Sequence, residues 1–563
     1  MRRIILLLLF VVPALTPAAT LPRQGVIASA NEQATAAGLE VLAQGGNAFD
    51  AAVAVSAALG LVEPESSGLG GGGFFLLHLA SENRVVFVDA RERAPMAATR
   101  DMYLDPQGNP RSGATVIGPL AAAIPGLPAG LDHVARHYGR LPLARSLAPA
   151  IRLAERGWRF GAKGRHGLAG KRDAIAANEA AAKLFLIRGE LPRVGARLRN
   201  PDYAKTLRLL AREGAGGFYR GDYARRMVAA VRGGGGIWRE QDLADYRVVE
   251  REPIRLQHRG YEIITAPPPS SGGIALGQML QVLGGYDYPR LARVPRLHLV
   301  LESMRRAYRD RAIHLGDPDF VSIPVAQLLS PDYAAGLRAS IHPHKALPSA
   351  LLPGVDVAME RVDTTHFSII DAEGNYAAVT QTINLPYGSA FVAPGTGFLL
   401  NNEMDDFSVK PGVPNEFGLV GAEANAIVPG KRPLSSMTPT FLVHPDRVAV
   451  IGTPGGSRII SMVLLATLSL MDGASAQDAV ALRRVHHQYL PDIVYAEQGA
   501  LSAAEQDALV QRGFTVEMAA ETWGNMHVAV WDRRSGAVEV GLDPRWRGER
   551  ERQDTSARGV IFR

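Results

Sequence analysis

RVDTTHFSIID (residues 361–371) places two adjacent threonines, Thr364 and Thr365, at the head of a predicted strand, directly after Asp363. Threonine is β-branched and common in strands, so an isolated pair of this kind is typical of an ordinary sheet. The preceding residues, 342–363, carry several prolines and no clean periodicity, which predicts an exposed connector. Cleavage of that connector before Thr364 would leave a free threonine at the start of a strand.

The two segments after the connector predict an antiparallel hairpin. THFSIID (365–371) and YAAVTQTIN (376–384) are joined by AEGN (372–375), a short loop that contains glycine. Near the N-terminus, residues 26–61 predict a strand, a helix that ends at Gly45–Gly46 and an alanine-rich helix. Asn47 is the expected N-cap of the second helix. The middle of the chain, roughly residues 115–345, reads as mostly helical.

Composition excludes several functional classes. The chain has 563 residues, of which 47% are hydrophobic and 21% charged, so a folded protein is expected. The net charge of +6 is a weak excess for this length, and the sequence has no Lys/Arg tract with interleaved aromatic residues. Nucleic-acid binding is therefore not expected. There is no cysteine, which excludes disulfides, cysteine-ligated zinc and a thiol nucleophile.

The N-terminal segment MRRIILLLLFVVPALTPAATLPRQG (1–25) has the three parts of a secretory signal. Two arginines precede an apolar run, Ile4–Leu15, and small residues follow at 16–20. The run is too short to span a bilayer stably, and a buried N-terminal helix is the alternative. We expect residues 1–19 to be a signal peptide and the protein to be exported, either periplasmic or secreted, with no membrane span after signal removal.

Three other patterns are tempting but unspecific. GLGGGGFF (68–75) is not followed by Lys-Ser/Thr and lacks a strand–helix context, so we do not expect it to bind phosphate. We expect instead that it allows chain segments to pack closely near the site. The adjacent histidines of VHHQYLPD (485–492) project to different sides of a regular element, which disfavours metal binding. Ser270–Ser271 is not a G-x-S-x-G nucleophile elbow.

An ordered set of longer segments carries a family resemblance. In the second half these are DTTHFSIIDAEGNYAAVTQTIN (363–384), GFLLNNEMDDFS (397–408), KRPLSSMTPTF (431–441) and GTPGGSRII (452–460). In the first half they are GGNAFDAAVAV (45–55), GLGGGGFFLL (68–77), DARERAPMAATRDMYLD (89–105), APPPSSGG (266–273) and HLGDPDF (314–320). Together they resemble the γ-glutamyltransferases (γ-glutamyl transpeptidases), N-terminal-nucleophile hydrolases that cut themselves into two subunits.

The resemblance implies a fold and a subunit structure. The expected fold class is α/β (α+β), a four-layer αββα sandwich with two stacked, mainly antiparallel sheets. Cleavage between Asp363 and Thr364 would give a large subunit, residues 20–363, and a small catalytic subunit, residues 364–563. Both subunits would associate to build one αββα unit.

The chemistry of Thr364 follows from its residue type. A threonine hydroxyl is a poor nucleophile unless a base lies beside it. After cleavage Thr364 would carry an α-amino group with a pKa of about 7.7–8.0, so one residue would supply nucleophile and base. The same hydroxyl can attack the preceding carbonyl and form an ester that water hydrolyses, without an outside protease. The resemblance makes Thr364 the nucleophile, with Thr382 hydrogen-bonded to it; Thr365 would lie on the other strand face.

The remaining roles are also implied by the resemblance. Asn384, Glu403 and Asp406 would hold the α-ammonium group of the donor, since a buried cation needs paired charges. A hairpin's polar face is the alternative for Thr382 and Asn384. The three carboxylates of NNEMDDF (401–407) are also compatible with a calcium site. The span lacks the spacing of an EF-hand loop, however, so no metal is expected.

The donor's α-carboxylate would be bound by Arg91, whose planar fork suits bidentate pairing, and by the hydroxyls of Ser435 and Ser436. Gly455 and Gly456 would expose backbone N–H groups as an oxyanion hole. Taken alone, the serine pair and the glycine pair are each typical of an ordinary turn.

One position departs from the family pattern. Residues 409–425 resemble a lid over the donor pocket, and Phe417 stands where several bacterial relatives carry a tyrosine. The aromatic ring is kept and a hydroxyl is lost.

The resemblance implies γ-glutamyl transfer from glutathione and related amides to amino acids, short peptides or water, with no metal or organic cofactor. One alternative is a glutaryl-cephalosporin-type acylase on the same scaffold, although glutaryl donors lack the α-amino group. A second alternative is an unprocessed, inactive binding protein.

Overall fold

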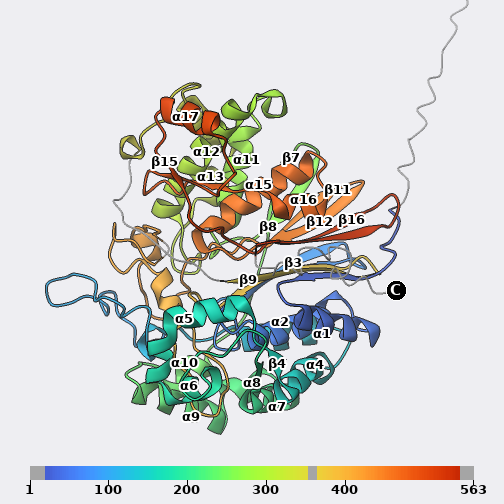
Figure 1. Cartoon of the computed structure of the whole chain (residues 1–563), viewed down its shortest axis with the longest axis vertical. Helices are drawn as coiled ribbons and strands as arrows, with labels where there is room; N and C mark the ends of the chain where they lie inside the picture. The colour runs from blue at the N-terminus through green and yellow to red at the C-terminus, as the bar shows by residue number, and fades with distance from the viewer. Residues whose placement is uncertain (1–18, 353–363, 417, 546–563) are drawn as a thin grey trace, which may run out of the picture.

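The computed structural model describes residues 19–352, 364–416 and 418–545. Several predictions therefore fall outside the described residues. They are the signal peptide (except for its last residue), the cleavage-site residue Asp363 and the lid residue Phe417. Figure 1 shows two stacked sheets with helices above and below them.

Two six-stranded sheets form the centre of the molecule, and neighbouring strands within each are antiparallel. The first sheet has, in spatial order, β1 (Val26–Ser29), β9 (Thr365–Ile370), β10 (Tyr376–Thr382), β2 (Gly72–Leu79), β3 (Arg84–Ala90) and β6 (Val249–Arg251). The second has β17 (Val538–Leu542), β16 (His527–Asp532), β12 (Arg447–Gly452), β11 (Thr440–His444), β8 (Tyr261–Thr265) and β7 (Ile254–His258). The predicted hairpin is confirmed as β9 and β10, which lie inside the first sheet.

The alternation of side chains along β2 explains the layers. Phe75 and Leu77 belong to the buried cluster shared with the helices below the first sheet, whereas Phe74 and Leu76 belong to the cluster that contains the second sheet. Successive strand residues face opposite sides, so a strand that is apolar on both faces is covered on both. The predicted four-layer αββα architecture is confirmed (Figure 1).

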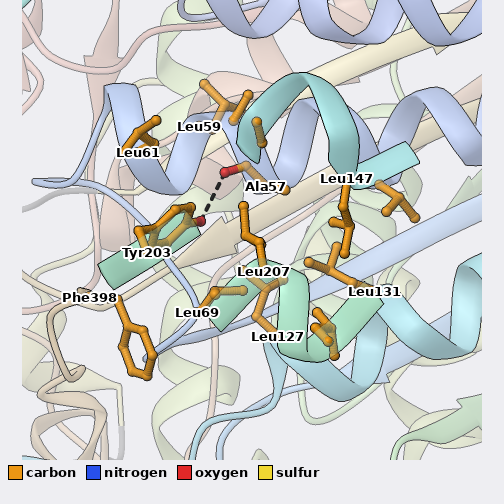
Figure 2. Close-up of a cluster of buried hydrophobic side chains, with 14 of the residues drawn as sticks. Ala57, Leu59, Leu61, Leu69, Leu127, Leu131, Leu147, Tyr203, Leu207 and Phe398 are labelled. Carbon is orange, nitrogen blue, oxygen red and sulfur yellow. Dashed lines mark hydrogen bonds between the residues drawn. The ribbon is translucent and has the colours of Figure 1, made fainter. Parts of the chain in front are cut away.

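Helices α1 (Glu32–Ala43) and α2 (Ala48–Val62) cover the outer face of the first sheet. The predicted cap is confirmed, because the Asn47 side chain accepts from the N–H groups of Phe49 and Asp50 at 3.0 Å. Every residue of α2 is buried, and its many alanines allow close packing. The hydroxyl of Tyr203, on α7 (Pro201–Glu213), donates to the carbonyl of Ala57 within this core (Figure 2).

Helices α11 (Gly272–Leu283), α12 (Arg293–His314) and α15 (Ile459–Met471) cover the outer face of the second sheet (Figure 1). The remaining helices are α3 (Leu127–His137), α4 (Leu143–Arg156), α5 (Ala162–Ala177), α6 (Glu179–Phe185), α8 (Ala215–Tyr219), α9 (Gly221–Gly233), α10 (Glu240–Ala244), α13 (Val325–Leu328), α14 (Pro331–Ala339), α16 (Ala476–Ala481) and α17 (Ala503–Gln511). The remaining strands are β4 (Trp158–Arg159), β5 (Arg197–Leu198), β13 (Val485–His486), β14 (Val494–Ala496) and β15 (Val516–Met518). No helix among the described residues combines the length and the apolar character needed to cross a membrane.

Candidate active site

Three strand ends of the first sheet meet at one edge. Thr364 directly precedes β9, Thr382 ends β10, and Arg91 directly follows β3. The register pairs Thr365 with Gln381, so the next step along both strands places Thr382 beside Thr364. The sheet therefore brings together residues that lie up to 291 positions apart in the chain.

The second sheet contributes the facing wall. Ser435 and Ser436 lie shortly before β11, and Gly455 and Gly456 lie shortly after β12. Because β11 and β12 pair antiparallel, the start of one strand and the end of the other lie at the same edge.

A pocket of about 280 Å³ opens at this edge. Its lining consists of Arg91, Thr364, Thr382, Asn384, Glu403, Asp406, Leu419, Ser435, Ser436, Met437, Gly456 and Ile459. Nine of the ten described residues predicted to be catalytic or substrate-binding line it, and the tenth, Gly455, adjoins Gly456. Of the described carboxylates in 401–407, Asp405 is the one that points elsewhere, accepting from Thr115 Oγ1 at 2.6 Å.

The two threonines of the opening motif have different environments. Thr364 lines the pocket and is 4% exposed. The hydroxyl of Thr365 donates to Glu63 Oε2 at 2.9 Å and is fully buried on the other face of the sheet. Thr364 is thus the member of the pair that faces the pocket, which is the geometry a nucleophile requires.

Beyond β10 the chain turns sharply. Thr382 Oγ1 accepts from the N–H of Asn384 at 2.7 Å, and Asn384 has a φ of +75°. The Asn384 side chain donates from Nδ2 to the carbonyl of Asn402 at 2.9 Å. Asparagine tolerates this left-handed conformation better than most residues, which explains its presence at the turn. The turn points both Thr382 and Asn384 into the pocket.

The glycine pair forms the turn between β12 and the helices that follow. Gly455 has φ +145° and Gly456 has φ +48°, conformations that favour glycine. A Cβ atom at Gly455 would overlap with Met462 Cε. A short 3₁₀ segment, Gly456–Arg458, leads into α15. Backbone N–H groups at the start of a helix are available donors, so this turn can serve as an oxyanion hole.

Glycine is also required in the run 68–73. A Cβ atom at Gly71 would overlap with the carbonyl oxygen of Thr382. Close packing of chains beside the site, which the sequence analysis expected for this run, is therefore present.

Charged groups in the pocket form a compact cluster. The Arg91 guanidinium forms ion pairs with Glu403 and Asp406, and its Nε donates to the carbonyl of Pro433 at 3.2 Å. Glu92 Oε2 lies 3.5 Å from Arg91 Nη1. The neighbouring Arg93 instead donates to the carbonyl of Gly430 at 2.8 Å.

Burial governs the protonation of this cluster. Burial raises the pKa of Glu403 well above its usual value and also raises that of Asp406, although the Arg91 charge opposes both shifts. Burial raises the pKa of Glu92 to about 7, again against Arg91. Both carboxylate oxygens of Glu92 lack a hydrogen-bond partner in the described part of the chain. Arg91 thus faces three carboxyl groups whose charged forms are disfavoured by burial, and an added cation would favour those charged forms.

The cluster suits a ligand that carries both charges. A ligand carboxylate would take the place of Glu403 and Asp406 on Arg91, and a ligand ammonium would then pair with the released carboxylates. Three pocket-lining residues, Leu419, Met437 and Ile459, were not predicted as site residues, although Leu419 lies within the predicted lid, 409–425. The neighbouring Glu92 was not predicted either, because a single glutamate carries no signal of its own in the sequence. The described residues contain no group of three or more histidine or carboxylate side chains arranged to hold a metal ion.

Known proteins are similar to this chain over most of its length. A model of the family Gamma-glutamyltranspeptidase matches residues 34–552. The chain belongs to the gamma-glutamyltranspeptidase family. It is 42% identical over 522 residues to the glutathione hydrolase proenzyme of Pseudomonas sp. (strain A14), covering 92% of this chain and 88% of that relative. It is 41% identical over 483 residues to the glutathione hydrolase proenzyme of Escherichia coli (strain K12), covering 85% and 83%.

A solved structure is similar over the same extent. The cephalosporin acylase from Bacillus halodurans superposes with a TM-score of 0.81 at 28% identity, covering 94% of this chain and 95% of that one. This structural relative is named a cephalosporin acylase, a name that differs from that of the two glutathione hydrolase proenzymes.

Proposed function

We propose that this member of the gamma-glutamyltranspeptidase family cleaves the γ-glutamyl amide of glutathione and related donors, and transfers the γ-glutamyl group to water, amino acids or short peptides. The observation that carries the proposal is the pocket shared by Thr364, Arg91, Glu403 and Asp406. A γ-glutamyl group has an α-carboxylate and an α-ammonium at one end and the scissile amide at the other. Arg91 and the two carboxylates match the charged end, and Thr364 is positioned for the amide.

The proposed reaction has two steps. The Thr364 hydroxyl oxygen attacks the γ-carbonyl carbon, and its proton passes to the α-amine of the same residue. The resulting oxyanion is stabilised by N–H groups of Gly455 and Gly456. The carbon–nitrogen bond then breaks, the leaving amine takes the proton, and a γ-glutamyl–Thr364 ester remains. Water or an acceptor amine attacks this ester, gives its proton to the α-amine, and regenerates the hydroxyl.

The mechanism requires a free α-amine on Thr364, and therefore cleavage after Asp363. We infer self-cleavage into residues 20–363 and 364–563, with prior removal of residues 1–19 during export to the periplasm or the medium. The proenzyme names of the relatives support a precursor that is cut.

The chief alternative is an acylase activity like that named for the Bacillus halodurans relative. A glutaryl group has no α-ammonium and would leave the carboxylates of Glu403 and Asp406 without a cation once Arg91 turned to the ligand. Unpaired buried charges are costly, so the two carboxylates favour a γ-glutamyl donor.

Two variants test the proposal. Thr364→Ala should give one band near full length on a denaturing gel and should release no p-nitroaniline from γ-glutamyl-p-nitroanilide. Thr365→Val, at the neighbouring threonine outside the pocket, should still give two fragments. The wild-type small fragment should begin at Thr364. Normal fragments from Thr364→Ala, or a different first residue, would refute the assignment.

A further inference from the structure

A second arginine lies behind the pocket wall. Arg311, on α12, is 5% exposed, and its guanidinium contacts two serine hydroxyls. Nε donates to Ser271 Oγ at 3.0 Å, and Nη2 donates to Ser436 Oγ at 3.3 Å. Among the described residues, no carboxylate lies within 4.0 Å of this guanidinium, although Asp406 is close enough to interact with it electrostatically. Burial lowers the pKa of Arg311 to about 10, so the group is charged at neutral pH.

A buried arginine without a carboxylate partner is unusual, because desolvation of a charge is costly unless an opposite charge compensates. The other buried arginines of α12 illustrate the rule. Arg305 and Arg306 both pair with Glu302, three and four residues away. Arg311 instead lies between the donor pocket, which Ser436 lines, and an adjoining cavity of about 270 Å³, which Arg311 itself lines together with Asp406.

Hydrogen-bond donor and acceptor rules fix the direction of these contacts. Arginine has donors only, and a hydroxyl has one proton and two lone pairs. Ser436 must therefore accept from Arg311, which leaves the Ser436 proton available to an acceptor in the pocket. Ser271 also accepts from Arg311 and donates its own proton to the carbonyl of Ser435 at 2.8 Å. A single guanidinium thus orients Ser436 directly and the backbone of Ser435 through Ser271.

The loop that carries Ser271 is joined to the serine pair at further points. The N–H of Ser271 donates to the carbonyl of Ser435 at 2.7 Å, and Ser435 N–H donates to the carbonyl of Pro269 at 2.8 Å. Ser270 Oγ donates to the carbonyl of Met437 at 2.7 Å. The serine pair is therefore held rigidly, and within the described part of the chain Arg311 is the cationic side chain that hydrogen-bonds to it.

We propose that Arg311 is a positioning residue for the α-carboxylate of the donor, acting through the Ser436 hydroxyl. The positive charge polarises that hydroxyl and keeps its proton directed to the pocket, where a ligand carboxylate accepts it. This inference rests on the proposed γ-glutamyl activity. It adds to the α-carboxylate site a second cation that does not itself line the donor pocket.

A double-mutant cycle tests the inference, with γ-glutamyl-p-nitroanilide as donor and the processed enzyme in every case. Arg311→Met should raise KM about 10- to 100-fold, the loss expected for one hydrogen bond to a charged group, with kcat within about threefold. Ser436→Ala should raise KM similarly. The double variant should be no worse than the poorer single variant, because both changes remove the same interaction.

The proposal would be overturned if the KM of the double variant rose by the product of the two single-variant increases. A fall in kcat with KM unchanged would overturn it as well. Arg309→Met is the matched control, since Arg309 lies on the same helix and pairs with Asp310; it should leave KM unchanged. If Arg311→Met fails to give two fragments, Arg311→Lys takes its place in the cycle. Lysine keeps the charge but lacks the planar fork that reaches both serines. We therefore expect Arg311→Lys to raise KM less than Arg311→Met, and its effect should again not multiply with that of Ser436→Ala. A wild-type enzyme that releases no p-nitroaniline would refute the proposed function instead.

Discussion

Replacing Asp406 by asparagine should change which acyl group the enzyme prefers. Arg91 pairs with both Glu403 and Asp406, so Asp406→Asn leaves the Arg91–Glu403 pair in place. The fold should therefore survive the change. With a γ-glutamyl donor bound, Arg91 turns to the donor carboxylate, and the α-ammonium is left with one carboxylate instead of two.

The size of the effect follows from the burial of the pair. Asp406 is 11% exposed in its side chain, and removing one partner of a buried, hydrogen-bonded charge pair costs about 2–5 kcal/mol. Asparagine keeps the shape and one oxygen, so we expect the lower part of that range, about 2–3 kcal/mol. This corresponds to a loss of about 30- to 150-fold in kcat/KM for the γ-glutamyl donor. A glutaryl donor brings no ammonium, so its kcat/KM should not fall.

The assay compares γ-glutamyl-p-nitroanilide with glutaryl-p-nitroanilide on the same preparation. Asp405→Asn is the matched control, because Asp405 is buried in the same segment but binds Thr115 and the N–H of Glu416 outside the pocket. It should affect both substrates alike. An equal loss of both activities in Asp406→Asn, or a γ-glutamyl loss below threefold, would refute the assignment of Asp406 to the ammonium.

The remaining predictions concern the turn, the acid stability and the subunits. Gly455→Ala should lower kcat about 100-fold by shifting the proposed oxyanion donors, whereas Gly473→Ala, at a similarly left-handed glycine after α15, should leave kcat unchanged. Burial lowers the pKa of His487 to about 4. Between about pH 6.5 and 4 the unfolded state therefore binds one more proton than the folded state, and the free energy of unfolding falls by about 1 kcal/mol for each pH unit of acidification. In urea unfolding, His487→Gln should make the free energy of unfolding less dependent on pH. The two fragments should co-elute on gel filtration without denaturant, because β9 pairs with β1; separation would contradict the shared sheet.

Much of the architecture was predictable because local signals and the fold agree. The hairpin of β9 and β10 follows from two apolar strands around a glycine loop, and the Asn47 cap follows from residue type and position. The gathering of most predicted residues in one pocket was also foreseen, since the motifs resemble a family with a shared site.

Other features have no local signal. Arg311 is one of six arginines on α12, and nothing in the sequence separates it from Arg305 or Arg306, which find Glu302 on the same helix. Its contacts with Ser271 and Ser436 span 40 and 125 residues. The pairing of Arg91 with Glu403 spans 312 residues and joins groups that were predicted to bind the two opposite charges at one end of a ligand. Tertiary packing alone creates these contacts.

The pairing of Arg91 with Glu403 and Asp406 also explains how the pocket can select its ligand. Arg91 pairs with Glu403 and Asp406, and burial raises the pKa of both carboxyl groups, so unpaired buried charge is limited. A ligand that carries only a carboxylate would take Arg91 and leave Glu403 and Asp406 unpaired. A ligand that carries only an ammonium would compete with Arg91 and gain nothing from the serine hydroxyls. Only a ligand with both charges replaces every broken pair with an equivalent one, so selectivity arises from the cost of the charges that a wrong ligand leaves behind.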